Sequence, residues 1–139
     1  MRAFLDASVL IFAIERPASN SAVVVELALA GRLQAVVDEE VLAEIARFFR
    51  KRRGRSFAWL YAEQVRRVAR VVTRDECRAD FDALGGQLKQ SDRLHLAASR
   101  TTGTRHLIAY DEDFQPFKEY MTPRQAVRRL GRAPKETEW

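Results

Sequence analysis

The sequence is poor in the residues that build cross-linked or zinc-binding proteins, with one cysteine, Cys77, and two histidines among 139 residues. One cysteine excludes an internal disulfide, and no second cysteine or histidine stands at zinc-ligand spacing. This scarcity predicts a reducing, cytoplasmic setting. Long apolar runs are also absent, and Asp6 splits the apolar start MRAFLDASVLIFAI. Neither a membrane span nor a signal peptide is therefore predicted.

The chain is strongly basic, with 24 Lys+Arg against 19 Asp+Glu and a formal net charge of +5. Such a balance favours an anionic partner, which could be nucleic acid, an acidic protein or a membrane surface. Its length and 47% hydrophobic content predict one compact domain over residues 1–139. Within it, residues 131–139 have the composition of a disordered tail, so an ordered tail would have to be held by the domain or by a neighbouring chain.

Short apolar runs alternate with segments of helical periodicity along the whole chain. Strands are predicted at 2–5, 33–37 and 105–110, with a short one at 70–72. Helices are predicted at 7–16, 19–31, 38–52, 56–69, 74–86, 91–103 and 121–130. Ser91 is the predicted N-cap of one helix, and Thr122 with Pro123 begins the last. This alternation predicts an α/β fold in which helices cover both faces of a parallel sheet.

Four acids fall where such a fold gathers ligands. Asp6 ends the first strand and Asp111 follows the last one, while Glu44 lies inside a helix and Asp92 in the first turn of another. Ligands collect at the carboxyl ends of the strands in open α/β sheets, so these carboxylates are expected to converge. The run DED at 111–113 is also compatible with an ordinary acidic loop.

Each acid has an alternative explanation. Asp92 near a helix start is favoured by the helix dipole alone. Glu44 could pair with Arg47 one turn on, and Glu40 competes with it as the helical acid. Asp6 is harder to explain, because an acid inside so apolar a run is costly to bury without a partner.

Taken together, the order of four motifs resembles the PIN domain, the fold of the VapC toxins and related nucleases. The motifs are FLDASVL, VLAEIARF, SDRLHLAAS followed by TG, and LIAYDEDF. The resemblance runs from Arg2 to the helix TPRQAVRRL. It implies a three-layer α/β/α domain with a short central parallel sheet of about four to five strands.

The resemblance also implies a metal-dependent endoribonuclease, the toxin of a VapBC-type pair held inactive by a small antitoxin. Crowded carboxylates repel one another, and Mg²⁺ or Mn²⁺, which prefers oxygen ligands, removes that conflict. Asp6, Asp92 and Asp111 are the expected metal ligands, with Glu44 a further ligand or the base that orients water. Ser8 and Asp113 are expected to support these carboxylates.

Ala109 departs from the family pattern, since many members carry Thr or Ser just before the fourth acid. Glu112 is an added charge. A second interpretation is therefore a catalytically weak PIN domain that serves as an RNA-binding or assembly module. A third, a nucleotide binder or receiver domain, lacks the glycine-rich phosphate loop that nucleotide binding favours.

A basic segment completes the pattern, because an acidic pocket alone would repel RNA. Its members are Arg47, Arg50, Lys51, Arg52, Arg53 and Arg55. They are predicted to contact RNA phosphates, although an acidic antitoxin is an alternative partner. The neighbouring Phe48, Phe49 and Phe57 could stack bases, but their helix positions favour the core.

Four further residues, two histidines and two aromatic residues, are predicted to have ordinary structural roles. His95 lies one turn from Asp92 and could touch the site, but it and His106 are predicted to be ordinary core or surface histidines. Trp59 and Tyr61 are expected in the core or at an interface. In PIN proteins the helices after the third often build a dimer, so residues 56–65 are the candidate for homodimer formation.

Overall fold

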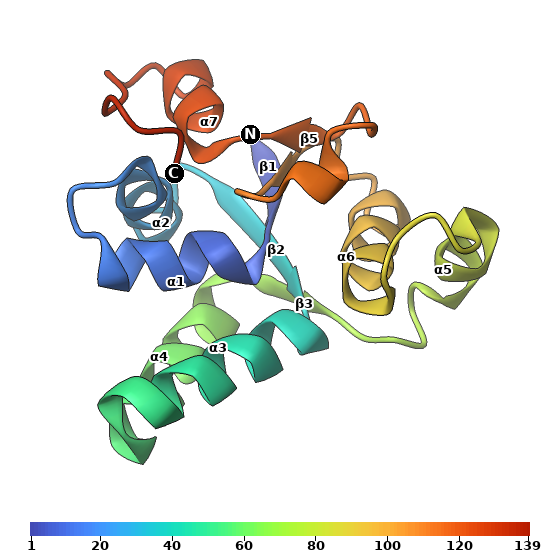
Figure 1. Cartoon of the computed structure of the whole chain (residues 1–139), viewed down its shortest axis with the longest axis horizontal. Coiled ribbons are helices and arrows are strands. Elements are labelled where there is room, and N and C mark those ends of the chain that lie inside the picture. Colours follow the sequence, from blue (N-terminus) through green and yellow to red (C-terminus); the bar gives the residue numbers. More distant parts are fainter.

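The computed structural model describes all 139 residues, and the predicted alternation of strands and helices is confirmed (Figure 1). The elements are β1 (Arg2–Leu5), α1 (Ala7–Glu15), α2 (Asn20–Leu29), β2 (Gln34–Asp38), α3 (Glu39–Arg53), α4 (Arg55–Val68), β3 (Arg70–Val72), α5 (Arg78–Leu84), α6 (Gln90–Thr101), β4 (Leu107–Ile108), the 3₁₀ turn η1 (Glu112–Phe114), β5 (Tyr120–Met121) and α7 (Pro123–Arg129).

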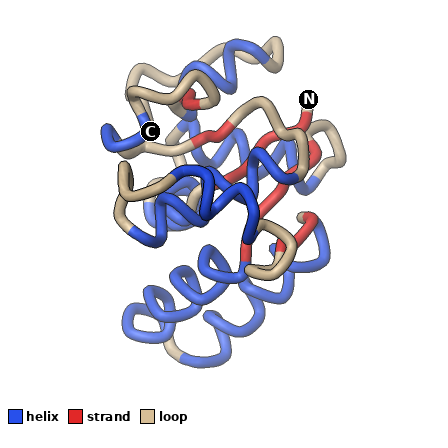
Figure 2. The backbone as a smooth tube through the Cα atoms, turned by 90° about the vertical axis from the view of Figure 1, so that its right-hand side faces the viewer, coloured by secondary structure: helices blue, strands red, loops and turns tan.

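The five strands form one parallel sheet in the order β3-β2-β1-β4-β5. Viewed from the side, the strands run through the middle of the molecule with helices around them (Figure 2). The last strand, β5, was not predicted, because two residues leave no periodicity to recognise. β5 forms because its backbone pairs with that of β4, with Leu107 opposite Tyr120 and Ile108 opposite Met121.

The helices form the outer layers. α1, α2 and α7 pack together on one side of the strands, while α6, backed by α5, packs on β1 and β2 from the other (Figure 1). α3 and α4 pack closely against each other beside the β3 end of the sheet. The predicted three-layer α/β/α arrangement with four to five strands is confirmed.

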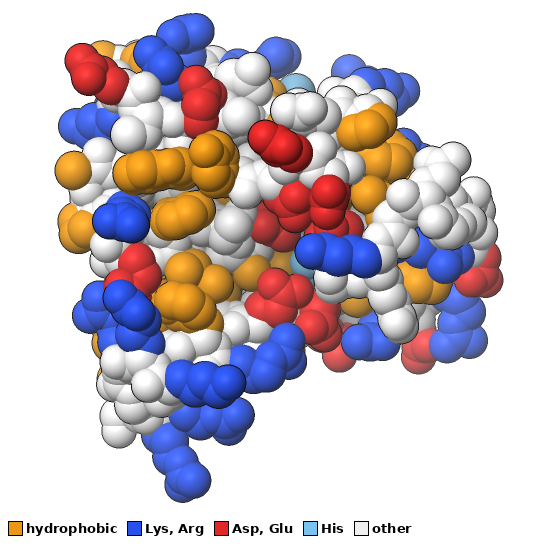
Figure 3. Space-filling model, in the orientation of Figure 1, with side chains coloured by type: hydrophobic (Ala, Val, Ile, Leu, Met, Phe, Trp, Pro, Cys, Tyr) orange, Lys and Arg blue, Asp and Glu red, His pale blue; other side chains and the backbone are white.

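The strand order determines where a site can lie. β1 is central, and the chain passes from β1 to β2 on one side and later returns to β4 on the other. Connections that leave in opposite directions open a crevice at the carboxyl ends of β1 and β4. On the face shown in Figure 3, acidic side chains gather in the middle, with basic side chains around them.

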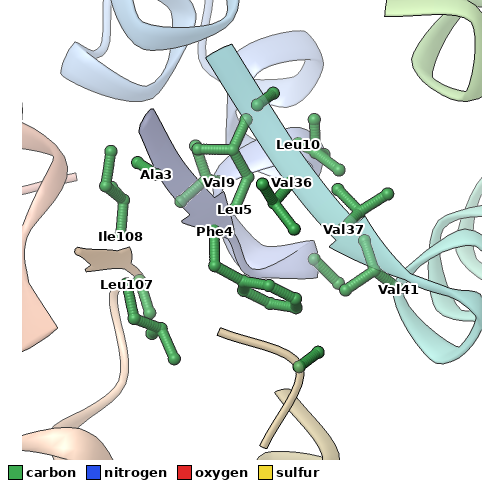
Figure 4. Packing of buried hydrophobic residues seen from close by; sticks show 14 of the residues in the cluster. Ala3, Phe4, Leu5, Val9, Leu10, Val36, Val37, Val41, Leu107 and Ile108 are labelled. Atoms are coloured by element: carbon green, nitrogen blue, oxygen red, sulfur yellow. The ribbon is translucent and has the colours of Figure 1, made fainter. Parts of the chain in front are cut away.

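The hydrophobic core fills the space between sheet and helices. Val9 and Leu10 of α1 pack near Val36 and Val37 of β2, and Phe4 of β1 points toward the opposite layer (Figure 4). The strands are apolar on both faces because both faces are covered, as expected for a parallel sheet. This rigid base fixes the residues at the strand ends.

Two local predictions were wrong. The extended residue before α6 is Lys89, with φ −61° and ψ 158°, so Ser91 lies inside the first turn and is not the N-cap. α5 begins at Arg78 and not at residue 74; Thr73 and Glu76 exchange side-chain-to-backbone hydrogen bonds across a turn that precedes the helix.

The tail 131–139 is held by the domain itself. Asn20 at the start of α2 donates its side-chain amide to the Thr137 carbonyl at 2.5 Å and accepts from the Lys135 N–H at 2.7 Å. Trp139 stacks on Phe12 of α1 with ring centroids 5.6 Å apart. These contacts order a segment whose composition predicts disorder.

No single helix is long and apolar enough to cross a membrane. Only α1 and α2 taken as a pair have the length and composition, and they meet at a bend of 104°.

Candidate functional site

Acids at the ends of three strands cap the elements that follow. Asp6 begins α1, and its Oδ2 accepts hydrogen bonds from the Ser8 N–H at 3.1 Å and the Ser8 hydroxyl at 2.6 Å. Asp38 caps α3 in the same way, and Asp111 caps η1. Helix starts stabilise negative charge and offer free N–H groups, so each carboxylate is anchored at the carboxyl edge of the sheet.

The predicted ligands meet at this edge. The ligand atoms of Asp6, Asp92 and His95 lie within 4.8 Å of one another, as do those of Asp92, Asp111 and Asp113. Asp92 belongs to both groups and therefore joins them. Asp92 thus lies within 4.8 Å of Asp6 in one group and of both Asp111 and Asp113 in the other.

Asp92 has the most unusual environment. Its side chain is buried, and its Oδ2 has no hydrogen-bond partner, although the Lys89 ammonium lies 3.5 Å away. Burial raises the pKa of Asp92 to about 6, with Lys89 opposing the rise and the charges of Asp111 and Asp6 adding to it. A buried carboxylate oxygen that makes no hydrogen bond and lies among other acids fits a divalent cation, which takes oxygen ligands.

His95 lies beneath the acids. Its Nδ1 is 2.5 Å from Asp38 Oδ2, and its Nε2 lies 3.6 Å from Asp6 Oδ1 and 3.5 Å from Glu44 Oε1. Burial opposes protonation, but hydrogen bonds to Asp38 and Glu44 and the nearby negative charges raise the pKa of His95 to about 10. The surroundings of His95 therefore favour its protonated form, and each of its ring nitrogens faces a carboxylate.

The pKa of Asp6 is raised as well. Burial is the main cause and the charge of Glu44 adds to it, while His95 and the hydrogen bonds from Ser8 act in the opposite direction. The raised pKa values of Asp6 and Asp92 mean that these two buried acids hold their protons more tightly than free aspartates do. Additional positive charge at the edge would lower both pKa values.

Sequence reasoning missed the pair of Asp38 and His95. Asp38 was assigned to the acidic start of a helix, yet it also ends β2, which neighbours β1 in the sheet. The rule that selected Asp6 and Asp111 therefore applied to it too. His95 was predicted to be an ordinary histidine; it is buried as a core histidine would be, and it also contacts the site.

Glu44 faces the site from α3 and Glu40 does not. The predicted alternative pairing of Glu44 with Arg47 is absent, because Arg47 pairs with Glu40 at 3.0 Å. Glu40 also lies 3.5 Å from Arg74. Glu44 is left with His95 as its partner and keeps 30% of its side chain exposed, so one face of its carboxylate meets solvent.

The basic segment lies at the junction of α3 and α4. Arg52 and Arg53 pair with Glu15 of α1 at 3.0 and 3.4 Å, whereas Arg50, Lys51 and Arg55 form no ion pair. Its exposed cations are free to meet an anion.

The aromatic residues near this segment serve the core, as their spacing favours. Phe49 is fully buried and packs edge to face with Phe57 and Tyr61. The Tyr61 hydroxyl donates to the Leu10 carbonyl at 2.6 Å. Trp59, by contrast, is 62% exposed. The prediction of core or interface is confirmed for Tyr61 as core and stays open for Trp59.

The fold is similar to several solved structures. One is a toxin–antitoxin complex from Klebsiella pneumoniae, at a TM-score of 0.70 and 18% identity over 87% of this chain and 97% of that one. VapBC2 from Rickettsia felis bound to a promoter DNA fragment gives 0.66 and 16%, over 88% and 97%. VapC20 of Mycobacterium tuberculosis, described as a Sarcin-Ricin loop cleaving toxin, gives 0.60 and 20%, over 82% and 93%.

No curated protein matches the sequence. The profile of one family, the PIN domain, matches residues 2–113, which is well over half of the chain and includes all the acids of the edge. The motif order, the parallel sheet and the meeting of Asp6, Asp92 and Asp111 agree with that match. The chain belongs to the PIN domain family.

Proposed function

We propose that the protein is a metal-dependent endoribonuclease that hydrolyses phosphodiester bonds of RNA in the cytoplasm, as the toxin of a VapBC-type pair. One observation carries the proposal: Asp92 is buried among acids from separate segments of the fold, and its Oδ2 makes no hydrogen bond and has only the Lys89 ammonium, 3.5 Å away. An acid kept buried beside like charges is typical of a metal centre.

Asp6, Asp92 and Asp111 would hold Mg²⁺ or Mn²⁺, with Asp113 close enough to Asp92 to share the ion or orient its ligands. Oxygen donors without thiolates favour these hard cations over zinc. A bound Mg²⁺ or Mn²⁺ would polarise the scissile phosphate and stabilise the charge that develops on the leaving oxygen.

The remaining residues of the site would activate the attacking water or hold the metal-binding carboxylates in position. Glu44, partly exposed at the rim, would orient the attacking water and accept its proton. Ser8 fixes Asp6 through two hydrogen bonds. His95, held by Asp38, would fix the direction of Asp6 and Glu44 and offset part of their charge.

The surface of the molecule and its solved relatives support three kinds of partner: RNA, an antitoxin and a second copy of the chain. The unpaired cations of the basic segment would draw RNA to the acidic edge. Toxin–antitoxin complexes among the solved relatives support an antitoxin as a second partner. Trp59 and Leu60 are each more than 60% exposed on α4, which supports this helix as a homodimer surface.

A second candidate function is a catalytically weak PIN domain that binds RNA or partners without cleaving. The observation that favours it is Ala109, which is fully buried and offers no hydroxyl where many members have one. Its backbone N–H bonds to the Met121 carbonyl at 3.1 Å, so the position serves the sheet.

Cleavage of labelled RNA by the purified chain separates the two. We expect cleavage with Mg²⁺ or Mn²⁺, none with EDTA, and a loss on the order of a thousandfold in Asp6→Asn and Asp92→Asn, since several kcal/mol of transition-state stabilisation disappear. Glu63→Gln on α4 is the control acid and should keep full activity. Unchanged cleavage in both aspartate variants would sink the proposal.

A further inference from the structure

A pocket of about 490 Å³ opens beside Asp92, between the start of α3, helix α5 and the start of α6. Gln90 and Ser91, which line it, directly precede Asp92, and Glu40 lies one turn before Glu44. The pocket therefore begins where the acidic edge ends. Its volume lies in the range of roughly 300–1,000 Å³ that suits one small ligand.

The apolar part of the pocket includes an aromatic ring. Phe81 and Leu94 line it, and Phe81 is only half-buried. The Arg93 guanidinium lies 3.8 Å from the centroid of the Phe81 ring, and its Nε donates to the Phe81 carbonyl at 2.7 Å. A cation and a hydrogen bond thus hold this ring in place, as a stacking platform requires.

Polar side chains with free hydrogen-bonding groups face the same space. Gln90 and Asp82 are exposed pocket residues, and neither side chain makes a hydrogen bond within the protein. An amide offers donors and an acceptor, and a carboxylate offers acceptors, which together can match the edge of a flipped-out base.

Two arginines complete the lining. Arg74 lies 3.5 Å from Glu40, and Arg78 pairs with Asp75 one turn earlier. Both arginines are more than half exposed, and ion pairs of this kind are weak, so a phosphate can replace the present partners. The combination is a stacking ring, polar groups for a base edge and cations for a phosphate.

We propose that this pocket receives one unpaired nucleobase of the RNA strand, next to the phosphate held at the acidic edge. The inference rests on the proposed function and adds a specificity subsite to it, formed by Phe81, Gln90 and Asp82. Base stacking on Phe81 anchors the strand, and the polar groups select among bases.

The test is binding of labelled single-stranded RNA in EDTA, followed by fluorescence anisotropy, with a single abasic nucleotide moved along the strand. One abasic position should weaken binding by the wild-type protein by roughly five- to 150-fold, the range of one base stack. Phe81→Leu should weaken binding of intact RNA by a similar factor. The abasic change at that position should then add no further loss.

Phe117→Leu is the matched control, because Phe117 is also half-buried, has the Arg100 guanidinium 5.9 Å from its ring and does not line the pocket. It should bind like the wild type. Gln90→Ala, at an exposed site that tolerates change, should reduce the preference among the four bases at the sensitive position, and Gln64→Ala on α4 should not.

Equal abasic penalties in the wild type and in Phe81→Leu would overturn the subsite. Full displacement of the RNA by nucleoside monophosphates would also overturn it, since that result assigns the pocket to a free nucleotide. Binding in EDTA needs no catalysis. If the protein does not cleave RNA, the binding experiment can therefore still test the base subsite. If the binding experiment contradicts the subsite, the proposed metal site is not affected.

Discussion

The acidic edge and the basic segment of this molecule are built in opposite ways. The acids come from separate segments and include the buried Asp6 and Asp92, and those that follow the strands, among them Asp6 and Asp111, are anchored by capping hydrogen bonds. The cations of the basic segment come from one stretch at the α3–α4 junction and stay exposed. The first region exists only in the folded chain, whereas the second is already present in the sequence.

The acidic edge and the basic segment also differ in how their charges affect the stability of the fold. Burial raises the pKa values of Asp6 and Asp92, so the ionised acidic edge opposes folding until a cation binds. Exposed arginines carry no such strain, because water solvates them. Substitutions at the edge should therefore have large effects that differ from residue to residue, and substitutions in the basic segment should have small, additive effects that depend on salt.

The largest expected effect concerns His95, whose loss would leave Asp38 and Asp6 buried without their cation. His95→Ala should lower the free energy of unfolding by roughly 3–5 kcal/mol, as breaking a buried pair does. Urea denaturation measures it. His106→Ala is the control and should change stability by less than about 1 kcal/mol. A small effect at His95 would mean that the acidic edge does not depend on a buried cation.

A smaller effect of opposite sign is expected at Asp92. Its pKa rises from 3.8 to about 6 on folding, so the folded state holds the proton more tightly. Stability from this group is complete below pH 4 and falls as pH rises through 6. Asp92→Asn should therefore stabilise the metal-free protein at pH 7.5, by on the order of 2 kcal/mol, and by much less at pH 4.

Adding Mg²⁺ to the stability measurement tests whether Asp92 binds the metal. Because the proton and the metal compete for Asp92, Mg²⁺ should raise the melting temperature of the wild type more at pH 7.5 than at pH 5. Asp92→Asn should lose most of that response, and Glu63→Gln should keep it. If Mg²⁺ stabilised Asp92→Asn and the wild type equally, Asp92 would not be a ligand of the metal.

The smallest expected effects are in the basic segment. Replacing its three unpaired cations, Arg50, Lys51 and Arg55, with Gln should weaken RNA binding for every sequence alike. The slope of log K against log salt should fall in magnitude by up to about 2, at about 0.7 for each phosphate that is no longer neutralised. The same change at Arg128, Arg129 and Arg132 is the matched control. Equal slopes in both triple variants would mean that RNA does not prefer this segment.

The sequence predicted the fold and the site correctly where a local pattern of residues is enough to place an element or a side chain. Strand ends identified Asp6 and Asp111, and the alternation of elements predicted the three layers. It was uninformative where the outcome depended on contacts between distant segments. The two-residue β5 exists because β4 pairs with it, and Asp38 became part of the site because α6 delivers His95 to it. Ser91 was mistaken for an N-cap because a local residue preference does not determine where a helix begins.

The most direct measurement is a crystal of the protein soaked with Mn²⁺ and examined by anomalous diffraction. We expect an anomalous peak from a Mn²⁺ ion bound by carboxylate oxygens of Asp6, Asp92 and Asp111, and we expect the peak to be lost in Asp92→Asn crystals soaked in the same way. A Mn²⁺ ion bound elsewhere, or no peak at saturating Mn²⁺ above pH 7, would contradict the claim that the acidic edge is a metal centre.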